Sequence, residues 1–332
     1  MNKEVSYFAG LSVEQGSRSL ALALLKKANK SSARLQTLED SEALHDFRVA
    51  LRRLRNCLKA YASYLPVDKK IEKKLRKIAR QTNKTRDHEV MIQWLQNETK
   101  NFTPTHRIGL DWVLDHYKKK YELDLSKIQS RILPAWEKIE TQLSRYLQQN
   151  KDTGKLQSHE SFIQFSGNIS NNYCQQLSER LALVSGIHNI SEMHAARIAA
   201  KHLRYLLEPF ADTVPESKDI VNELKTFQDL LGAFHDNSVF IEKLSSVVRR
   251  AAADHAYKLY LSAVSDNDEQ TEALRKHGPI PGLLKLVKNV KSHRDEMFAE
   301  IQKRYLQNGI VPLTDRVMHL SSKLMELDTT NQ

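Results

Sequence analysis

Glycine and proline are scarce in this chain. Its 332 residues include 10 Gly and 8 Pro, so few positions favour tight turns and most of the chain can form long regular elements. Hydrophobic residues make up 40% of the chain, which is enough to build a core at this length and argues against global disorder. We therefore expect long helices that are joined by few turns.

Cysteine and long apolar runs are also rare or missing. Cys57 and Cys174 stand alone, without CxxC or metal-ligand spacing, so we interpret both as buried free thiols in a reducing compartment. No apolar stretch approaches the roughly 20 residues that span a bilayer. The first residues lack the basic region and apolar run of a signal peptide. These absences predict a cytoplasmic protein without membrane insertion.

Aromatic residues and catalytic motifs are equally sparse. Aromatic side chains account for 7% of the chain, and several, such as Phe47, fall at core positions rather than on an exposed platform that could stack nucleic-acid bases. The chain contains no GxxxxGK[ST], HExxH or GxSxG motif, which are the patterns of phosphate loops, metalloproteases and serine hydrolases. We therefore expect no catalytic residues, no metal site and no cofactor.

Positive charge, by contrast, is abundant. The net charge is +11 and the isoelectric point is about 9.4. Proteins of this charge commonly bind polyanions, such as nucleic acid, anionic membranes or phosphate-rich ligands. A solvated cationic surface without a ligand is the plainer alternative.

Two segments of the chain repeat at one fixed distance. "HDFRVALRRLRN" (45–56) matches "HAARIAAKHLRY" (194–205) at an offset of 149 residues, with five identities. The same offset aligns "LRKIARQTNKTRDHEVMIQWL" (75–95) with "LKTFQDLLGAFHDNSVFIEKL" (224–244). One ungapped offset that links two motifs predicts a tandem duplication with halves at 8–150 and 158–332. The polar segment 148–161, "QQNKDTGKLQSHES", reads as the linker between them.

The apolar periodicity is helical throughout. In the first half it predicts helices at 12–37, 41–64, 68–98 and a pair over 104–149 that is interrupted near Pro134. The second half is expected to repeat this plan, with breaks at Pro209 and Pro215, a long helix after Pro281 and a last helix with Thr314 as its N-cap. The predicted fold is all-α, with two antiparallel helical bundles packed as pseudo-symmetric halves.

The repeated motif places its cations on one side of a helix. At 100° per residue, the basic residues of the first copy fall within a stripe of about 80° beside a stripe of apolar residues. The second copy forms the same stripe. Like charges at this spacing repel each other, so we expect an anion to neutralise them. The two cationic stripes consist of His45, Arg48, Arg52, Arg55 and Lys59 and of His194, Arg197, Lys201 and Arg204.

The third predicted helix adds positive charge to the first half only. The segment Lys69–Arg86 contains nine basic residues and one acid, whereas the matching segment Lys218–His235 contains two basic residues and three acids. We expect Asp87 and Asp236 to orient neighbouring Arg or His side chains, or simply to accept hydrogen bonds from backbone N–H groups. The candidate ligand residues of this helix are Lys73, Lys77, Arg80, Lys84 and Arg86.

Phosphate is the anion that suits these stripes. The Arg guanidinium matches phosphate oxygens in bidentate fashion, and Lys acts as a mobile point charge. Cations about one helical turn apart, roughly 5.4 Å, can follow a repeating chain of phosphates. A bound polyanion would also raise the pKa of His45 and His194 toward protonation.

With these motifs the chain resembles the CHAD family, the conserved histidine α-helical domain. The pattern His-x-x-Arg-Val-x-x-Arg-Arg-x-Arg occurs at 45–55, a degenerate copy occurs at 194–204, and Arg-Asp-x-x-Val and His-Asp-x-x-Val occur at 86–90 and 235–239. The resemblance implies a single domain of two pseudo-symmetric helical bundles that enclose a basic cleft or pore. It also implies binding of inorganic polyphosphate without established catalysis, by the stripe residues His45, Arg48, Arg52 and Arg55 and their second-half counterparts.

Two positions depart from the family pattern. Asn83 stands where members often have the glycine that Gly232 supplies in the second half, and His235 replaces arginine. The expected partners are inorganic polyphosphate, with polyphosphate granules and polyphosphate-metabolising enzymes as further associations. Incidental nucleic-acid binding is also expected. Two alternatives stay open, a non-specific nucleic-acid-binding helical protein and a metal-dependent polyphosphate or triphosphate hydrolase or its accessory.

Overall fold

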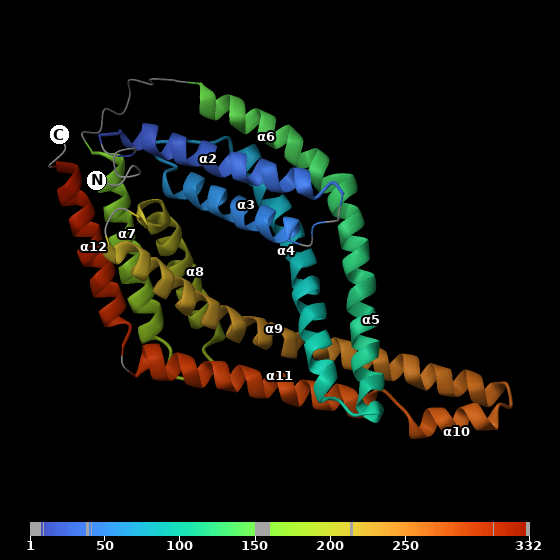
Figure 1. The fold of residues 1–332 in the computed structure, drawn as a ribbon. Helices are drawn as coiled ribbons and strands as arrows, with labels where there is room; N and C mark the ends of the chain where they lie inside the picture. Colours follow the sequence, from blue (N-terminus) through green and yellow to red (C-terminus); the bar gives the residue numbers. More distant parts are fainter. Residues whose placement is uncertain are drawn as a thin grey trace. The chain divides into compact units, whose positions relative to one another are not determined.

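The chain folds into helices, as the periodicity predicts (Figure 1). The computed structural model describes residues 8, 10–37, 40, 42–149, 160–212, 215–307 and 309–329, and no strand occurs among them. Most of the predicted linker therefore lies outside the described residues. Within the described ranges, no helix is long and apolar enough to cross a membrane.

The helices divide into two compact units. The first contains the described residues of Met1–Asn83, Lys127–Gly232 and Ile301–Gln332, and the second contains Lys84–Ser126 and Ala233–Glu300. The α-helices are α2 (Val13–Arg34), α3 (Ala43–Ala60), α4 (Lys69–Glu98), α5 (Pro104–Lys127), α6 (Leu133–Gln148), α7 (Phe162–Ala182), α8 (Ile190–Leu207), α9 (Pro215–Val264), α10 (Asp268–Lys276), α11 (Ile280–Ile301) and α12 (Val311–Thr329). Helices α4 and α9 each contribute residues to both units.

In the first unit, helices pack in two matching sets. Helix α2 packs against α3 and α6, while α7 packs against α8 and α12, and the sets meet where α2 contacts α7 and α3 contacts α8. Phe47, Trp136 and Phe162 are fully buried within this unit. Since α3 and α8 carry the repeated motif, their contact brings its two copies onto one pair of neighbouring helices.

Helices α2 and α7 begin in the same way. Ser12 accepts a hydrogen bond from the backbone N–H of Gln15, whose side chain accepts one from the Ser12 N–H, and Ser161 and Gln164 form the same capping box. Such a cap stabilises a helix by about 1 kcal/mol. Ser12 and Ser161 lie 149 residues apart and face each other across an isolated antiparallel bridge.

Short π-helical segments precede the last helix of each predicted half. Residues Ile128–Ile132 form one before α6, and Gln302–Leu306 form the other before α12. Pro134 therefore follows a distortion rather than a clean break. Thr314 is not the N-cap of the last helix, because α12 begins at Val311 and the Thr314 hydroxyl donates to the backbone carbonyls of Ile310 and Val311.

The second unit has its own apolar core, formed by residues of α4, α5, α9 and α11 such as Leu95, Val113, Leu244 and Leu286. Helices α5 and α11 approach closely, because a Cβ at Gly109 or Gly282 would collide with backbone of the other segment. The second half of the chain departs from the predicted repeat of the first. Helix α9 spans 50 residues against 30 in α4, and α10 has no counterpart in the first half.

Candidate functional site

The two cationic stripes lie on α3 and α8, which pack against each other in the first unit. Both helices bury their apolar stripe, with Phe47, Leu51 and Leu54 of α3 and Leu203 of α8 fully inaccessible. The core therefore fixes which side of each helix the cations occupy. His45, Arg48, Arg52, Arg55, His194, Arg197 and Lys201 are half-buried, and Lys59 is exposed.

Lys201 lies where the two stripes meet. Burial, followed by the neighbouring charges of Arg52, Arg197, Arg55 and Lys59, lowers its pKa to about 8. Three of these four cations come from α3, so the sequence-predicted stripes converge in space. These four residues are all positive, and an anion bound among them would stabilise the charged form of Lys201.

The surrounding cations show the same crowding. Burial, followed by Arg197 and Lys201, lowers the pKa of His194, so this imidazole is predominantly neutral at pH 7. Burial and the nearby Arg76 of α4 lower the pKa of Arg55, although an arginine remains charged. Arg76 belongs to the basic run on α4, but the stripe pattern did not single it out as a candidate ligand.

Some buried guanidinium nitrogens of the stripes have neither a hydrogen-bond acceptor nor a carboxylate close by in the described part of the chain. The Nε atoms of Arg52 and Arg197 are both inaccessible to solvent and have no acceptor among the described residues. A buried N–H without an acceptor costs about 1–3 kcal/mol. The Arg52 guanidinium also lies over the Tyr205 ring, 5.7 Å from its centroid, so an aromatic face that the sequence analysis had not considered helps to position it.

The first arginine of each motif copy has a different neighbour. Arg48 donates from Nε and Nη2 to the side-chain oxygen of Asn83 over 3.2 and 3.1 Å. The matching Arg197 faces Gly232, where an added Cβ would lie 3.5 Å from both Nε and Nη2. The departure at Asn83 therefore places a side-chain acceptor on an arginine whose counterpart meets only a glycine.

Arg204 of the α8 stripe has a carboxylate partner. It is 6% exposed, its guanidinium stacks 5.0 Å from the Tyr205 centroid, and its Nε lies 3.5 Å from Glu208. Glu208 also forms an ion pair with Arg53 at 2.8 Å. Arg204 thus holds the end of α8 to a carboxylate, whereas Lys201, one turn earlier, has cations around it.

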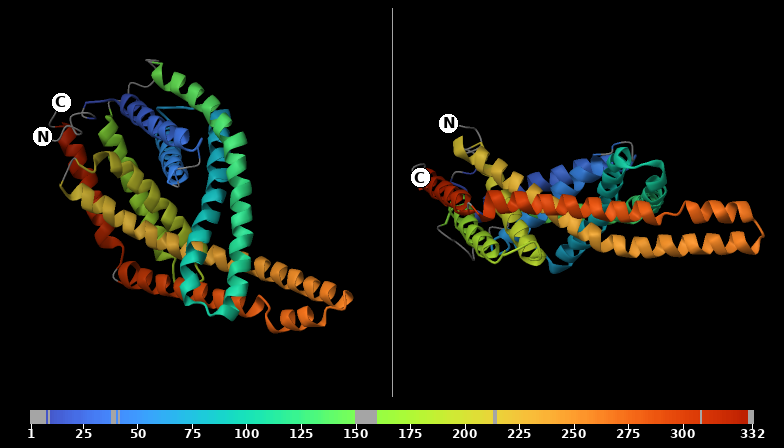
Figure 2. Two further views of the ribbon diagram at one scale, coloured as in Figure 1. Left: turned by 45° about the vertical axis from the view of Figure 1, so that its right-hand side comes forward. Right: turned by 90° about the horizontal axis from the view of Figure 1, so that it is seen from below.

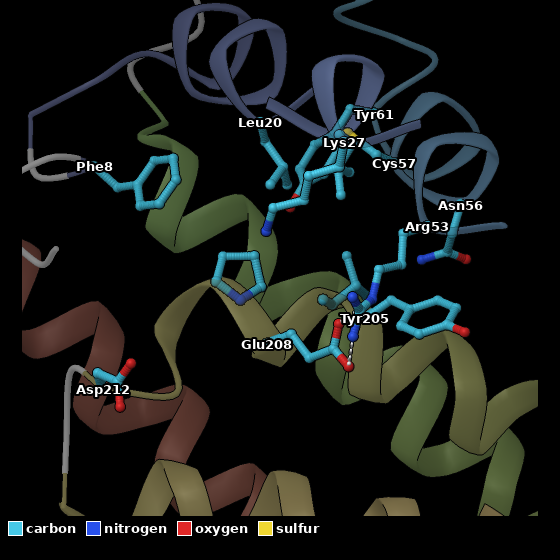
Figure 3. A pocket seen from close by; sticks show the side chains of 13 residues that line it. Phe8, Leu20, Lys27, Arg53, Asn56, Cys57, Tyr61, Tyr205, Glu208 and Asp212 are labelled. Carbon is cyan, nitrogen blue, oxygen red and sulfur yellow. Dashed lines mark hydrogen bonds and ion pairs between the residues drawn. The ribbon is translucent and has the colours of Figure 1, made fainter. Parts of the chain in front are cut away.

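A cavity of about 630 Å³ lies beside these residues, and Figure 3 shows it. Its lining includes Lys27, Cys57, Tyr61 and the Arg53–Glu208 pair, but none of the residues that surround Lys201. Burial raises the pKa of Cys57 and of Cys174 to about 12, which confirms both as buried free thiols. The cavity is therefore distinct from the cationic stripes.

The remaining candidates divide between the two units. Lys73, Lys77 and Arg80 are exposed on the part of α4 that belongs to the first unit. In the second unit, Lys84 lies 3.4 Å from Asp124 and Arg86 lies 2.8 Å from Glu89. Both of these cations therefore already have carboxylate partners.

Asp87 and Asp236 are exposed residues of the second unit. Asp124 and Glu89, which lie against Lys84 and Arg86, are almost fully buried, and Asp124 also lies 3.4 Å from Nδ1 of His88. Among the described residues, no group of three or more His, Cys, Asp or Glu side chains is arranged to hold a metal ion.

Comparisons with known proteins agree with the all-helical fold. The chain is similar to the crystal structure of the CHAD domain from the plant Ricinus communis, with a TM-score of 0.65, 19% identity and 92% of each chain covered. None of the curated proteins matches the chain. The family model described as "CHAD domain" matches residues 20–245. Because that match covers more than half of the sequence, the chain belongs to the CHAD domain family.

Proposed function

We propose that this protein binds inorganic polyphosphate along the cationic stripes of α3 and α8. One observation carries the proposal, namely that positive groups of both helices gather around Lys201 and lower its pKa. Such crowding raises the free energy of the unliganded state, and a chain of phosphates would remove the repulsion. CHAD domains are known as non-catalytic domains that bind polyphosphate.

The contacts favour an extended phosphate chain over a single phosphate. Cations succeed one another along α3 from Arg48 to Lys59 and continue to Lys201 and Arg197 on α8. The buried Nε atoms of Arg52 and Arg197 would each donate to a phosphate oxygen. Lys73, Lys77 and Arg80 would extend the track along α4. Lys84 and Arg86 would contribute least to binding, since phosphate there competes with Asp124 and Glu89.

The proposal includes a tandem duplication with halves at 8–150 and 158–332, which together make the single domain and enclose the basic cleft or pore. The matching capping boxes, the Ser12–Ser161 bridge and the two π-helical segments support it. So does the pairing of α3 with α8, since duplicated elements that pack about a pseudo-twofold axis meet their own copies. Association with polyphosphate granules or with polyphosphate-metabolising enzymes follows as a further proposal.

A titration with polyphosphates of defined length tests the proposed function. We expect affinity to rise with chain length until the track is filled, with much weaker binding of ATP. Affinity should fall steeply with salt, because bound polyanions release counterions. Long polyphosphate should displace DNA and RNA from the protein. If nucleic acid stays bound in excess polyphosphate, the stripes serve nucleic acid instead and the proposal fails.

A further inference from the structure

An apolar seam lies exposed near the end of α9 in the second unit. Its large side chains are strongly exposed, with Tyr257 at 61%, Tyr260 at 60%, Leu261 at 47% and Val264 at 62%. Ala253, one turn earlier, is exposed as well. The rings of Tyr257 and Tyr260 stack with centroids 6.2 Å apart. These five residues, called the α9 seam below, form a contiguous apolar surface, which on a soluble protein commonly marks an interaction site.

The α9 seam occupies one side of its helix. Its members are spaced by three and four residues, so at 100° per residue they fall within about 100° of one another. The opposite side of the helix is buried, at Ala251 and Ser262 for example. Helix α10 covers that opposite side, since the Thr271 hydroxyl donates to Ser262 over 2.9 Å. Figure 2 shows α9 and α10 side by side in both views.

Opposite charges flank the two ends of the seam. Arg249 and Arg250 are exposed before it and fall on the same side of the helix. Asp266, Asp268 and Glu269 are exposed after it, in the turn to α10 and its first residues. Among the residues that the structure describes, none of these five side chains forms an ion pair within the chain. Along α9 toward α10, the exposed surface is therefore first positive, then apolar and finally negative.

We propose that the α9 seam binds the same seam of a second copy of this chain, with the two helices antiparallel. An antiparallel pair centred between Ala253 and Val264 places Tyr257 of one copy opposite Tyr260 of the other. The arginines lie about nine residues, or roughly 13 Å, from that centre. They would therefore reach the acidic turn of the second copy, which lies at a similar distance on the other side. A parallel pair would instead place arginines against arginines.

The seam fits a protein partner better than the other surfaces that a basic protein meets. The alanine, leucine and valine of the seam offer a phosphate chain neither charge nor a hydrogen-bond donor, and an anionic membrane would repel the acidic turn at one end. The twelve residues from Ala253 to Val264 span about 17 Å of helix. An interface of that length falls at the low end of specific interfaces, below about 1,200 Å². We therefore expect a weak, reversible homodimer.

A charge exchange tests the proposal in the full-length chain without polyphosphate. By sedimentation velocity, Arg249→Glu with Arg250→Glu should weaken self-association at least tenfold, and so should Asp268→Lys with Glu269→Lys. Mixing the two double variants should restore a dimer, since each then offers the charge that the other lacks. Tyr260→Glu should weaken the dimer, whereas Lys258→Glu, which lies off the seam, should not.

Cross-linking tests the direction of the two helices. With mild oxidation, Ala253→Cys mixed with Val264→Cys should give mixed disulfides, while each variant alone should give few. Preferential cross-linking of each variant with itself would overturn the antiparallel arrangement. A chain that stays monomeric at high micromolar concentration, or a dimer that the seam variants leave intact, would overturn the proposal. Polyphosphate binding by all of these variants should be unchanged, which separates this surface from the α3 and α8 stripes.

Discussion

The α3 side and the α8 side of the site use the same motif under different local conditions. On α3, Arg48 donates two hydrogen bonds to Asn83, and the neighbouring part of α4 carries the dense run of basic residues. On α8, Arg197 faces Gly232 and Arg204 is held by Glu208. The repeated motif thus fixes where the cations lie, whereas their immediate partners decide how readily each can bind a phosphate.

The largest expected effect comes from removing the α3 cations. Changing Arg48, Arg52 and Arg55 to Ala together should weaken polyphosphate binding about a hundredfold or more, since each charge-assisted hydrogen bond contributes about 1.5–3 kcal/mol. Isothermal titration calorimetry measures the loss, and circular dichroism should show intact helices. Changing three exposed lysines outside the stripes, Lys26, Lys30 and Lys138, to Ala is the matched control. If that control weakens binding equally, net charge rather than the α3 stripe accounts for the affinity.

A smaller loss is expected on the α8 side. Arg197→Ala with Lys201→Ala should weaken binding by a smaller factor at pH 7, about tenfold or more, because two contacts rather than three are lost and the basic run on α4 is untouched. The midpoint of thermal unfolding should stay the same or rise, since removing Lys201 relieves repulsion in the unliganded protein. Arg204 is left out of this variant because its loss would leave Glu208 with one buried cationic partner fewer. A loss as large as that on α3 would show that the two sides contribute equally.

The pH dependence of polyphosphate affinity should reveal the contribution of Lys201. Its pKa of about 8 in the unliganded protein lies below the ordinary lysine value, and a bound polyanion would raise it again. Affinity should therefore fall about tenfold between pH 7 and pH 9, as Lys201 of the unliganded protein loses its proton. In Lys201→Arg, which stays charged over this range, fluorescence titrations should show a nearly flat profile.

The same titration affects folding with the opposite sign. A lysine whose pKa is lower in the folded than in the unfolded chain binds fewer protons when folded, so stability rises as pH rises from about 8 toward the unfolded value. Denaturant unfolding of the unliganded protein should show this rise, and Lys201→Arg should reduce it. A profile that is identical in the two proteins would mean that Lys201 is not crowded by its neighbours.

The smallest predicted effect exchanges the local partners of the two first arginines. Asn83→Ala releases Nε and Nη2 of Arg48 from their amide acceptor and should strengthen binding about threefold, the size of a modest net hydrogen bond. Gly232→Asn should weaken binding by a similar factor, because an added Cβ there is within ordinary contact of Arg197. Competition with a labelled polyphosphate can resolve such factors. Changes in the same direction for both variants would contradict the explanation.

Much of this arrangement could be predicted because it depends on local periodicity. The spacing of Phe47, Leu51 and Leu54 fixes the buried side of α3, and the cationic stripe follows from it. The family resemblance and the all-α fold were predicted correctly from the motifs. The fixed offset also indicated equivalent positions on α3 and α8. Helical periodicity does not predict that these two helices pack together.

What the sequence could not supply depends on contacts between distant residues. The Arg48–Asn83 hydrogen bonds join α3 to α4, and Lys84 meets Asp124, which belongs to α5. The face of Tyr205 serves three arginines, two of them from α3. The Arg204–Glu208 and Arg86–Glu89 pairs, separated by four and by three residues, were within reach of a local rule. The placement of Thr314 failed for a related reason, because Val311 and Pro312 had already begun the helix.

The two native thiols have a practical consequence. Thiolates are the reactive form of cysteine, and thiols with a pKa of about 12 that are also buried react very slowly with maleimides at neutral pH. A cysteine introduced at the exposed Lys59 could therefore carry a single fluorophore without removal of Cys57 or Cys174. Labelled in this way, the Lys59→Cys chain would become an optical reporter of phosphate polymers.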